Sequence, residues 1–151
     1  MVTTICSSVD FTPQIIEIKK ELETMGHTVN IPFFTTKIMN GEISYKEYME
    51  NKQKNNGDIL LRQGESVDTF KRYWNFIKDS DAILVVNLDK KGIKNYIGGN
   101  TLIEMGFAYG HDKKIFLFNP IPDRGERMHY VDEIIDMEPI VINGDLNLIK
   151  I

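Results

Sequence analysis

AILVVN (residues 82–87) opens the stretch that decides the fold, and it is followed by GGN (98–100), TLIEMGFAY (101–109) and IFLF (115–118). The two apolar runs are typical of buried strands, and the segment between them has the pattern of a glycine-rich loop and a helix. This order indicates a parallel β-α-β unit. In such a sheet ligands bind outside the carboxyl ends of the strands, where the GGN loop and Glu104 fall. We therefore expect a site near Glu104.

The rest of the chain continues the alternation of strands and helices. Thr12-Pro13 is a typical helix start, and the helix is expected to stop at Gly26. Strands are expected at residues 2–6, 28–31, 82–87, 115–118 and 139–142. Strands that are continuous apolar runs indicate a parallel sheet covered on both faces. The sequence therefore predicts an α/β fold: a flavodoxin-like (Rossmann-like) three-layer sandwich with a five-stranded parallel sheet in the order 2-1-3-4-5.

A single domain is predicted over residues 1–151, because a chain of this length can bury a core of its own. The least regular part is a helical insert at about 33–65, a candidate lid. Within it, SYKE (44–47) fits a capping box that begins a polar helix, and NNG (55–57) is expected to end that helix. A further helix is expected to begin at Ser66.

The composition and net charge argue against several classes of function. The net charge of −4 argues against nucleic acid as the main partner, although loop amides can still bind phosphate on a small molecule. The single cysteine, Cys6, excludes an intramolecular disulfide and is expected to be a buried structural thiol. No signal-peptide pattern or long apolar run is present, so we expect a cytoplasmic protein with no membrane partner. The three histidines lack metal-ligand spacing, and neither a metal nor a cofactor is expected.

Several motifs together resemble the nucleoside 2-deoxyribosyltransferase superfamily. They are CSS (6–8), GHTV (26–29) before Pro32, SDAILV (80–85), NYIGGNT (95–101) and EMGFA (104–108). The resemblance covers nearly the whole chain apart from residues 33–64. The superfamily includes transferases that exchange bases between deoxynucleosides and hydrolases that cleave the N-glycosidic bond of nucleoside monophosphates. The resemblance implies a nucleoside or nucleotide substrate and a homodimer or higher homo-oligomer.

By this resemblance, Glu104 matches the glutamate nucleophile of the family. A carboxylate suits that role because cleavage at C1′ develops oxocarbenium character, which the anion stabilises and can trap as a glycosyl ester. An alternative interpretation comes from the local pattern. TLIE (101–104) also fits a capping box, in which Glu104 would only bind the amide of Thr101.

Seven further residues are candidate substrate contacts: Ser7, Ser8, Asp10, Gly98, Gly99, Asn100 and Asn119. The resemblance implies that the two serines, Asn100 and the Gly99 amide hold a 5′-phosphate. The two glycines allow close approach of a ligand or simply form a turn. Asp10 is expected to orient a sugar hydroxyl or to begin a turn, and Asn119 to contact the sugar.

The chain departs from the family in three places. Members often place an aromatic hydroxyl from the first loop against the nucleophile, but Phe11 has none, which leaves Tyr96, Tyr109 or a residue of the insert for that role. Tyr73 and Gly98 stand where the transferases carry aspartates. Hydrolysis is therefore favoured over base exchange. The alternatives are a non-catalytic nucleotide or sugar-phosphate binding module and a nicotinamide-dinucleotide glycohydrolase.

Overall fold

A computed structural model describes residues 1–54 and 69–150 of the chain. Its strands are β1 (Val2–Cys6), β2 (Thr28–Asn30), β3 (Ala82–Val85), β4 (Lys114–Leu117) and β5 (Ile140–Val141). Its α-helices are α1 (Thr12–Thr24), α2 (Phe33–Met39), α3 (Tyr45–Lys54), α5 (Thr69–Asp79), α6 (Gly99–Gly110) and α7 (Val131–Asp136). Two short 3-10 helices are η1 (Val9–Phe11) and η2 (Leu146–Leu148).

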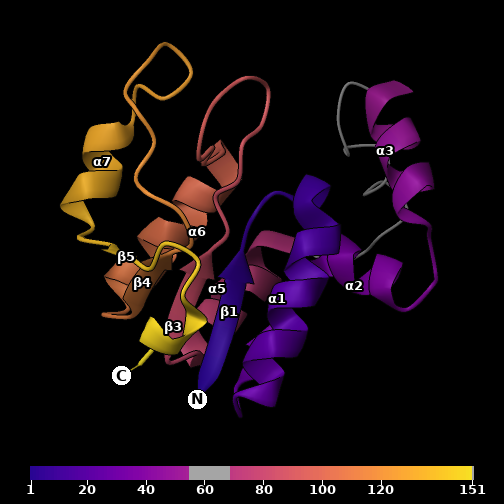
Figure 1. The fold of residues 1–151 in the computed structure, drawn as a ribbon, viewed down its shortest axis with the longest axis horizontal. Coiled ribbons are helices and arrows are strands. Elements are labelled where there is room, and N and C mark those ends of the chain that lie inside the picture. The colour runs from indigo at the N-terminus through magenta and orange to yellow at the C-terminus, as the bar shows by residue number, and fades with distance from the viewer. Residues whose placement is uncertain (55–68, 151) are drawn as a thin grey trace.

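The five strands form one parallel sheet in the order β2-β1-β3-β4-β5, which confirms the predicted flavodoxin-like α/β fold (Figure 1). The central register pairs Cys6 with Val85 and Val85 with Leu117. These three residues end their strands, so the loops that follow them leave the sheet at the same edge. The central strand β3 is buried along its whole length, as its apolar run predicts.

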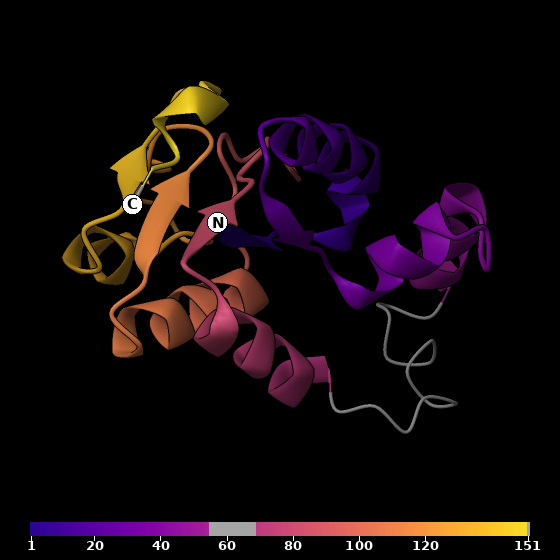
Figure 2. The same cartoon turned by 90° about the horizontal axis from the view of Figure 1, so that it is seen from below.

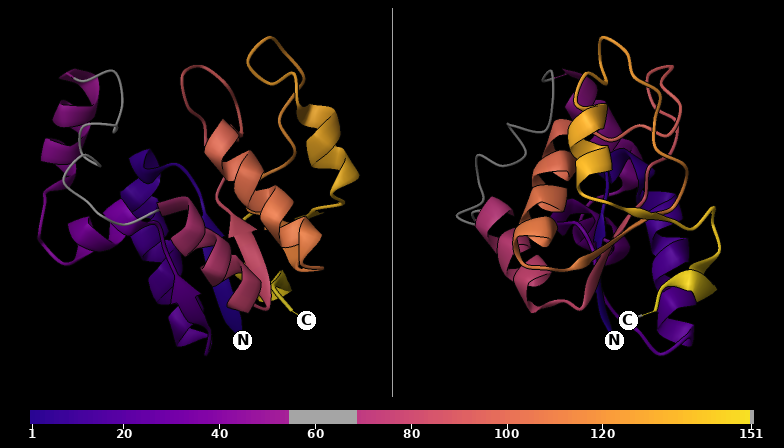
Figure 3. Two further views of the ribbon diagram at one scale, coloured as in Figure 1. Left: turned by 180° about the vertical axis from the view of Figure 1, so that it is seen from behind. Right: turned by 90° about the vertical axis from the view of Figure 1, so that its left-hand side faces the viewer.

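Helices cover both faces of the sheet, as Figure 2 shows. Because side chains alternate along a strand, Ile5 and Leu84 pack toward α1, whereas Cys6, Ile83 and Val85 pack toward α5, α6 and α7. Helices α5 and α6 lie side by side on that second face (Figure 3). The thiol of Cys6 therefore faces the layer that carries Glu104.

The described part of the insert contains α2 and α3, which lie beside the loop after β1 and away from the centre of the sheet (Figures 1 and 2). The predicted start of α3 is confirmed, because the Ser44 hydroxyl accepts a hydrogen bond of 3.0 Å from the Glu47 amide. The Tyr45 hydroxyl ties α3 to the first loop by donating to the Asp10 carbonyl at 2.6 Å. The predicted break at residues 55–57 and the helix start at Ser66 lie outside the described residues.

One helix begins earlier than the sequence pattern suggests. Helix α6 starts at Gly99 with Gly98 as its N-cap, three residues before Thr101, which a capping box would make the N-cap. Gly98 is extended, with φ −81° and ψ 168°, and caps the helix without a side-chain hydrogen bond. The Leu102 amide already donates to the Gly98 carbonyl at 2.9 Å. Thr101 thus lies within the helix, and the capping-box interpretation of Glu104 is wrong.

Candidate functional site

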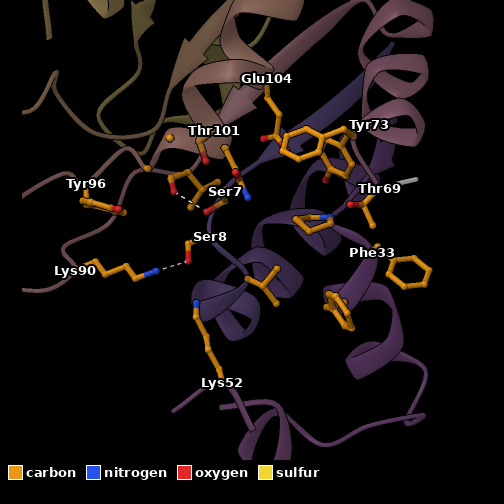
Figure 4. A pocket seen from close by; sticks show the side chains of 18 of the residues that line it. Ser7, Ser8, Phe33, Lys52, Thr69, Tyr73, Lys90, Tyr96, Thr101 and Glu104 are labelled. Atoms are coloured by element: carbon orange, nitrogen blue, oxygen red, sulfur yellow. Dashed lines mark hydrogen bonds between the residues drawn. The ribbon is translucent and has the colours of Figure 1, made fainter. Parts of the chain in front are cut away.

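A cavity of about 320 Å³ opens at the carboxyl edge of the sheet, on the side where the insert lies. Its walls come from the loop after β1, the start of α2, one face of α3, the first turns of α5, and the loop that leads into α6 (Figure 4). Of the eight predicted site residues, six line it: Ser7, Ser8, Gly98, Gly99, Asn100 and Glu104. The topology therefore brings most of the predicted residues together.

Glu104 extends from α6 into this cavity and lies beside the ring of Tyr73 (Figure 4). The residue as a whole is half-buried, but its Oε2 is enclosed and has no hydrogen-bond partner among the described residues. An enclosed carboxyl oxygen without a partner costs stability. Glu104 thus has the features of a group kept for a purpose other than capping the helix.

Burial raises the pKa of Glu104 to about 8, and a hydrogen bond from the Cys6 thiol partly opposes that rise. Cys6 is fully buried, as the sequence predicts, and burial followed by the nearby Glu104 carboxyl raises its own pKa well above the usual value. At neutral pH Glu104 therefore holds its proton most of the time in the free protein, and Cys6 stays a neutral thiol.

Tyr73 forms the wall of the cavity next to Glu104. Its hydroxyl donates a 2.8 Å hydrogen bond to the Ile5 carbonyl, which fixes the ring over the end of β1. Burial raises the pKa of Tyr73 well above its usual value, so this phenol stays protonated. Tyr73 is both buried in the core and part of the cavity wall.

The loop after β1 is held by its two serines. The Ser7 hydroxyl donates to the Val86 carbonyl at 2.8 Å, which joins this loop to the end of β3. The Ser8 hydroxyl caps η1 by accepting from the Asp10 amide at 3.3 Å. Ser8 also accepts from the Lys90 ammonium group at 2.8 Å. Both serines thus face the cavity with hydroxyl groups whose positions are fixed by the backbone.

Two lysines of the cavity wall were missed by the sequence analysis. Lys52 comes from α3 of the insert and Lys90 from the loop after β3, and their ammonium groups approach the first loop from different directions (Figure 4). Asp10 joins them, because its Oδ1 lies 2.5 Å from Lys52 Nζ and its Oδ2 lies 2.8 Å from Lys90 Nζ. The position of Lys90 shortly after a strand at the carboxyl edge was a signal that sequence reasoning overlooked.

Two predicted residues do not line the cavity. Asp10 lies behind its wall, where its carboxylate binds the two lysines, and their ammonium groups lower its pKa against the opposing effect of burial. The Asn119 side chain instead donates to the Asn87 carbonyl at 3.1 Å. Asn119 therefore joins the loops after β3 and β4, and the structure does not place it where a sugar in this cavity would lie.

Tyr96 and Tyr109 were the named candidates to supply the aromatic hydroxyl group that Phe11 lacks. Tyr96 lines the cavity and Tyr109 does not. Tyr109 is 57% exposed on the outer side of α6. Tyr96 lies over the loop that begins α6, with the Lys90 ammonium 5.5 Å from its ring centre. Further aromatic side chains on the wall come from α2, α3 and α5: Phe33, Phe34, Tyr48 and Phe70.

Within residues 1–54 and 69–150, no cluster of three or more histidine, cysteine or acidic side chains is arranged to hold a metal ion. None of the helices in the same ranges has the length and apolar character needed to cross a membrane.

Comparisons of the chain with family models, with curated proteins and with solved structures find no match. The geometry of the cavity is therefore the basis for assigning a function.

Proposed function

We propose that this protein cleaves the N-glycosidic bond of a nucleoside or nucleoside 5′-monophosphate, with Glu104 as the nucleophile. The observation that carries the proposal is the Glu104 carboxyl group, which faces the cavity with an enclosed oxygen that no described residue binds. Carboxyl groups with a strongly raised pKa in a crevice are characteristic of catalytic sites. The resemblance to nucleoside 2-deoxyribosyltransferases supports the same assignment of Glu104.

The proposed reaction has two steps. In the first, a carboxylate oxygen of Glu104 bonds to C1′ while the C1′–N bond breaks, and the departing base takes the electron pair and a proton from solvent. In the second, water attacks C1′ and releases Glu104 as a carboxylate, and the water's second proton passes to solvent. The sugar leaves with a hydroxyl group in the original configuration, so the route is retaining.

The raised pKa of Glu104 determines which form of the protein reacts. With a pKa of about 8, only about one-tenth of the molecules carry the carboxylate at pH 7. Positive charge that develops at C1′ favours the ionised form of an adjacent carboxyl group. Enclosure strengthens this attraction, because a low local dielectric increases electrostatic interactions. The same burial that suppresses ionisation in the free protein thus favours the transition state.

Hydrolysis is proposed over base exchange because the two aspartates of the transferases are replaced here. Tyr73 occupies one of these positions, and its hydroxyl proton is directed to the Ile5 carbonyl. Gly98 occupies the other and offers no side chain. The base is instead proposed to stack on aromatic rings of the wall such as Phe33 and Phe70, since every base has a face that can stack on them.

The test is a chromatographic assay of base release. The substrates are the ribo- and deoxyribonucleosides, their 5′-monophosphates and a nicotinamide dinucleotide, each with and without a free acceptor base. Wild type is compared with Glu104→Gln and with Glu133→Gln, an exposed acid of α7 as the matched control. Base release that is lost only in Glu104→Gln supports the proposal.

Other outcomes separate the alternatives. Base exchange in the acceptor reactions would make the protein a transferase, and release of nicotinamide alone would make it a dinucleotide glycohydrolase. If all three folded proteins release no base but bind a nucleotide, the cavity belongs to a binding module and the catalytic proposal fails.

A further inference from the structure

Asp10 holds two lysines that come from distant parts of the chain. Lys52 lies on α3 of the insert, whereas Lys90 lies in the loop after β3, and both ammonium groups reach the same carboxylate. Lys90 is set in place by its backbone, which exchanges two hydrogen bonds with Ile93 across a tight turn, at 3.0 and 2.9 Å. The geometry thus brings two cations to one point on the cavity wall.

This cluster carries more positive than negative charge. Two ammonium groups face one carboxylate, and the side chains are only 28% exposed for Lys52 and 14% exposed for both Lys90 and Asp10. Burial lowers the pKa of Lys90 despite its bond to Asp10. Charges removed from water are stable only when they are matched by opposite charge. The cluster therefore favours the binding of a further anion.

The hydrogen-bonding capacity of the two lysines also favours the binding of an anion. An ammonium group has three N–H donors. In the described part of the chain, Lys52 directs one to Asp10, and Lys90 directs one to Asp10 and one to Ser8. Each lysine therefore keeps at least one N–H donor that these bonds do not use, and both residues line the cavity. Glu104 is the one carboxyl side chain among the described wall residues, and its raised pKa limits repulsion of an anion at neutral pH.

We propose that Lys52, Lys90 and the Ser8 hydroxyl form a subsite for the phosphate group of a nucleoside 5′-monophosphate. This inference rests on the proposed function, and it makes the phosphorylated nucleotide the substrate class. Figure 4 shows Glu104 and the two ammonium groups on different parts of the cavity wall. A single nucleotide would then present its phosphate to the lysines and its C1′ to Glu104. The insert contributes Lys52 and so becomes a determinant of substrate choice.

The experiment measures binding by calorimetry to Glu104→Gln, which removes turnover during the titration. The ligands are the deoxyribonucleosides, their 5′-monophosphates and inorganic phosphate. Lys52→Gln and Lys90→Gln are added singly, so that Asp10 keeps one lysine partner and the chain keeps its fold. The matched controls are Lys54→Gln and Lys94→Gln, which change exposed lysines outside the cavity wall.

We expect a monophosphate to bind at least about tenfold more tightly than its nucleoside, as one or more charge-assisted hydrogen bonds would provide. Each cavity variant should reduce this ratio by about tenfold and leave nucleoside affinity unchanged, whereas the controls should keep the ratio. An unchanged ratio in both cavity variants, or no binding of inorganic phosphate and of every monophosphate, would overturn the subsite. Phosphate-dependent binding by a wild-type protein without turnover would refute only the proposed reaction. Nucleoside turnover without phosphate preference would refute only the subsite.

Discussion

Gly98 lies directly against the ring of Tyr96, so that a Cβ atom at position 98 would stand 3.2 Å from both Cε1 and the hydroxyl oxygen of Tyr96. This spacing is tighter than ordinary van der Waals contact. Gly98 is also the N-cap of α6, so the ring of Tyr96 lies against the loop from which the helix of Glu104 begins. The backbone angles of Gly98 suit any residue, so the constraint at this position is the Tyr96 ring, which a side chain at position 98 would push aside by a few tenths of an ångström.

Gly98→Ala is expected to displace the Tyr96 ring and to reduce nucleotide affinity at least about tenfold, with a stability loss of about 1 kcal/mol. The displaced ring belongs to the cavity wall, so the effect on binding should exceed the effect on folding. Calorimetric titration and urea unfolding measure the two effects. As a control, Gly106→Ala meets nothing within 4 Å and should stabilise α6 by about 0.5–1 kcal/mol. Full nucleotide affinity in Gly98→Ala would contradict this account.

The pH dependence of the proposed reaction follows from the pKa of Glu104. The nucleophile must be ionised, and its pKa in the free protein is raised to about 8. The value of kcat/KM should therefore rise about tenfold per pH unit below pH 7 and level off above pH 8. Initial rates between pH 5.5 and 9.5 check this expectation. A rate that is flat over the range, or that falls as pH rises through 8, would exclude Glu104 as an ionised nucleophile.

The same pKa predicts an effect on stability that needs no substrate. Between the ordinary glutamate pKa of 4.5 and the folded value of about 8, the native state keeps a proton that the unfolded state has lost. The Glu104 contribution therefore becomes less favourable as pH rises through this window, by up to about 1.4 kcal/mol per pH unit. Urea unfolding at pH 5, 6, 7 and 8 measures this decline.

Glu104→Gln provides the comparison for that measurement. The amide cannot ionise, so the difference in stability between the variant and wild type should grow in favour of the variant as pH rises from 5 to 8. Other ionisable groups are common to both proteins and cancel in the difference. A difference that stays constant over this range would show that the pKa of Glu104 is not raised by burial.

The sheet could be predicted because its strands are marked by local sequence patterns, and more than one pattern indicates the same fold. The apolar runs that became β3 and β4 are long enough to fix strand identity, and their alternation with helical patterns fixes parallel order. The position of Glu104 at this edge could be predicted for the same reason, since a helix that follows a strand begins at the carboxyl edge. The start of α6 was misplaced because Gly98 caps the helix through its backbone alone, which leaves no side-chain pattern to detect.

The cationic part of the site could not be predicted from the sequence. Lys52 lies on a polar helix of the insert, and nothing in its local pattern shows that this helix packs against the loop after β1. That contact depends on tertiary interactions such as the hydrogen bond from Tyr45 to the Asp10 carbonyl. Asp10 was predicted as a substrate contact or a turn residue, whereas its two lysine partners, 42 and 80 positions away in the chain, gave no local signal.

Asn87 and Asn119 join the loops after β3 and β4, and the Asn87 side chain makes most of the hydrogen bonds between them. The buried Asn87 side chain accepts from the Asn119 amide at 2.8 Å and donates to the carbonyls of Asn119 and Pro120 at 3.1 and 3.0 Å. Among the described residues, the Asn119 side chain makes one bond in return, to the Asn87 carbonyl. Loss of the Asn87 side chain would therefore remove three part-buried hydrogen bonds to the backbone of the loop after β4.

Asn87→Ala should consequently destabilise the protein by about 2–4 kcal/mol, and Asn119→Ala by at most about 1 kcal/mol, as measured by urea unfolding. Asn119→Ala should also keep nucleotide affinity and turnover, because its side chain lies outside the cavity wall. If Asn119→Ala instead loses affinity at least about tenfold while keeping its stability, Asn119 contacts the ligand and the sugar must extend beyond this cavity toward the loop after β4.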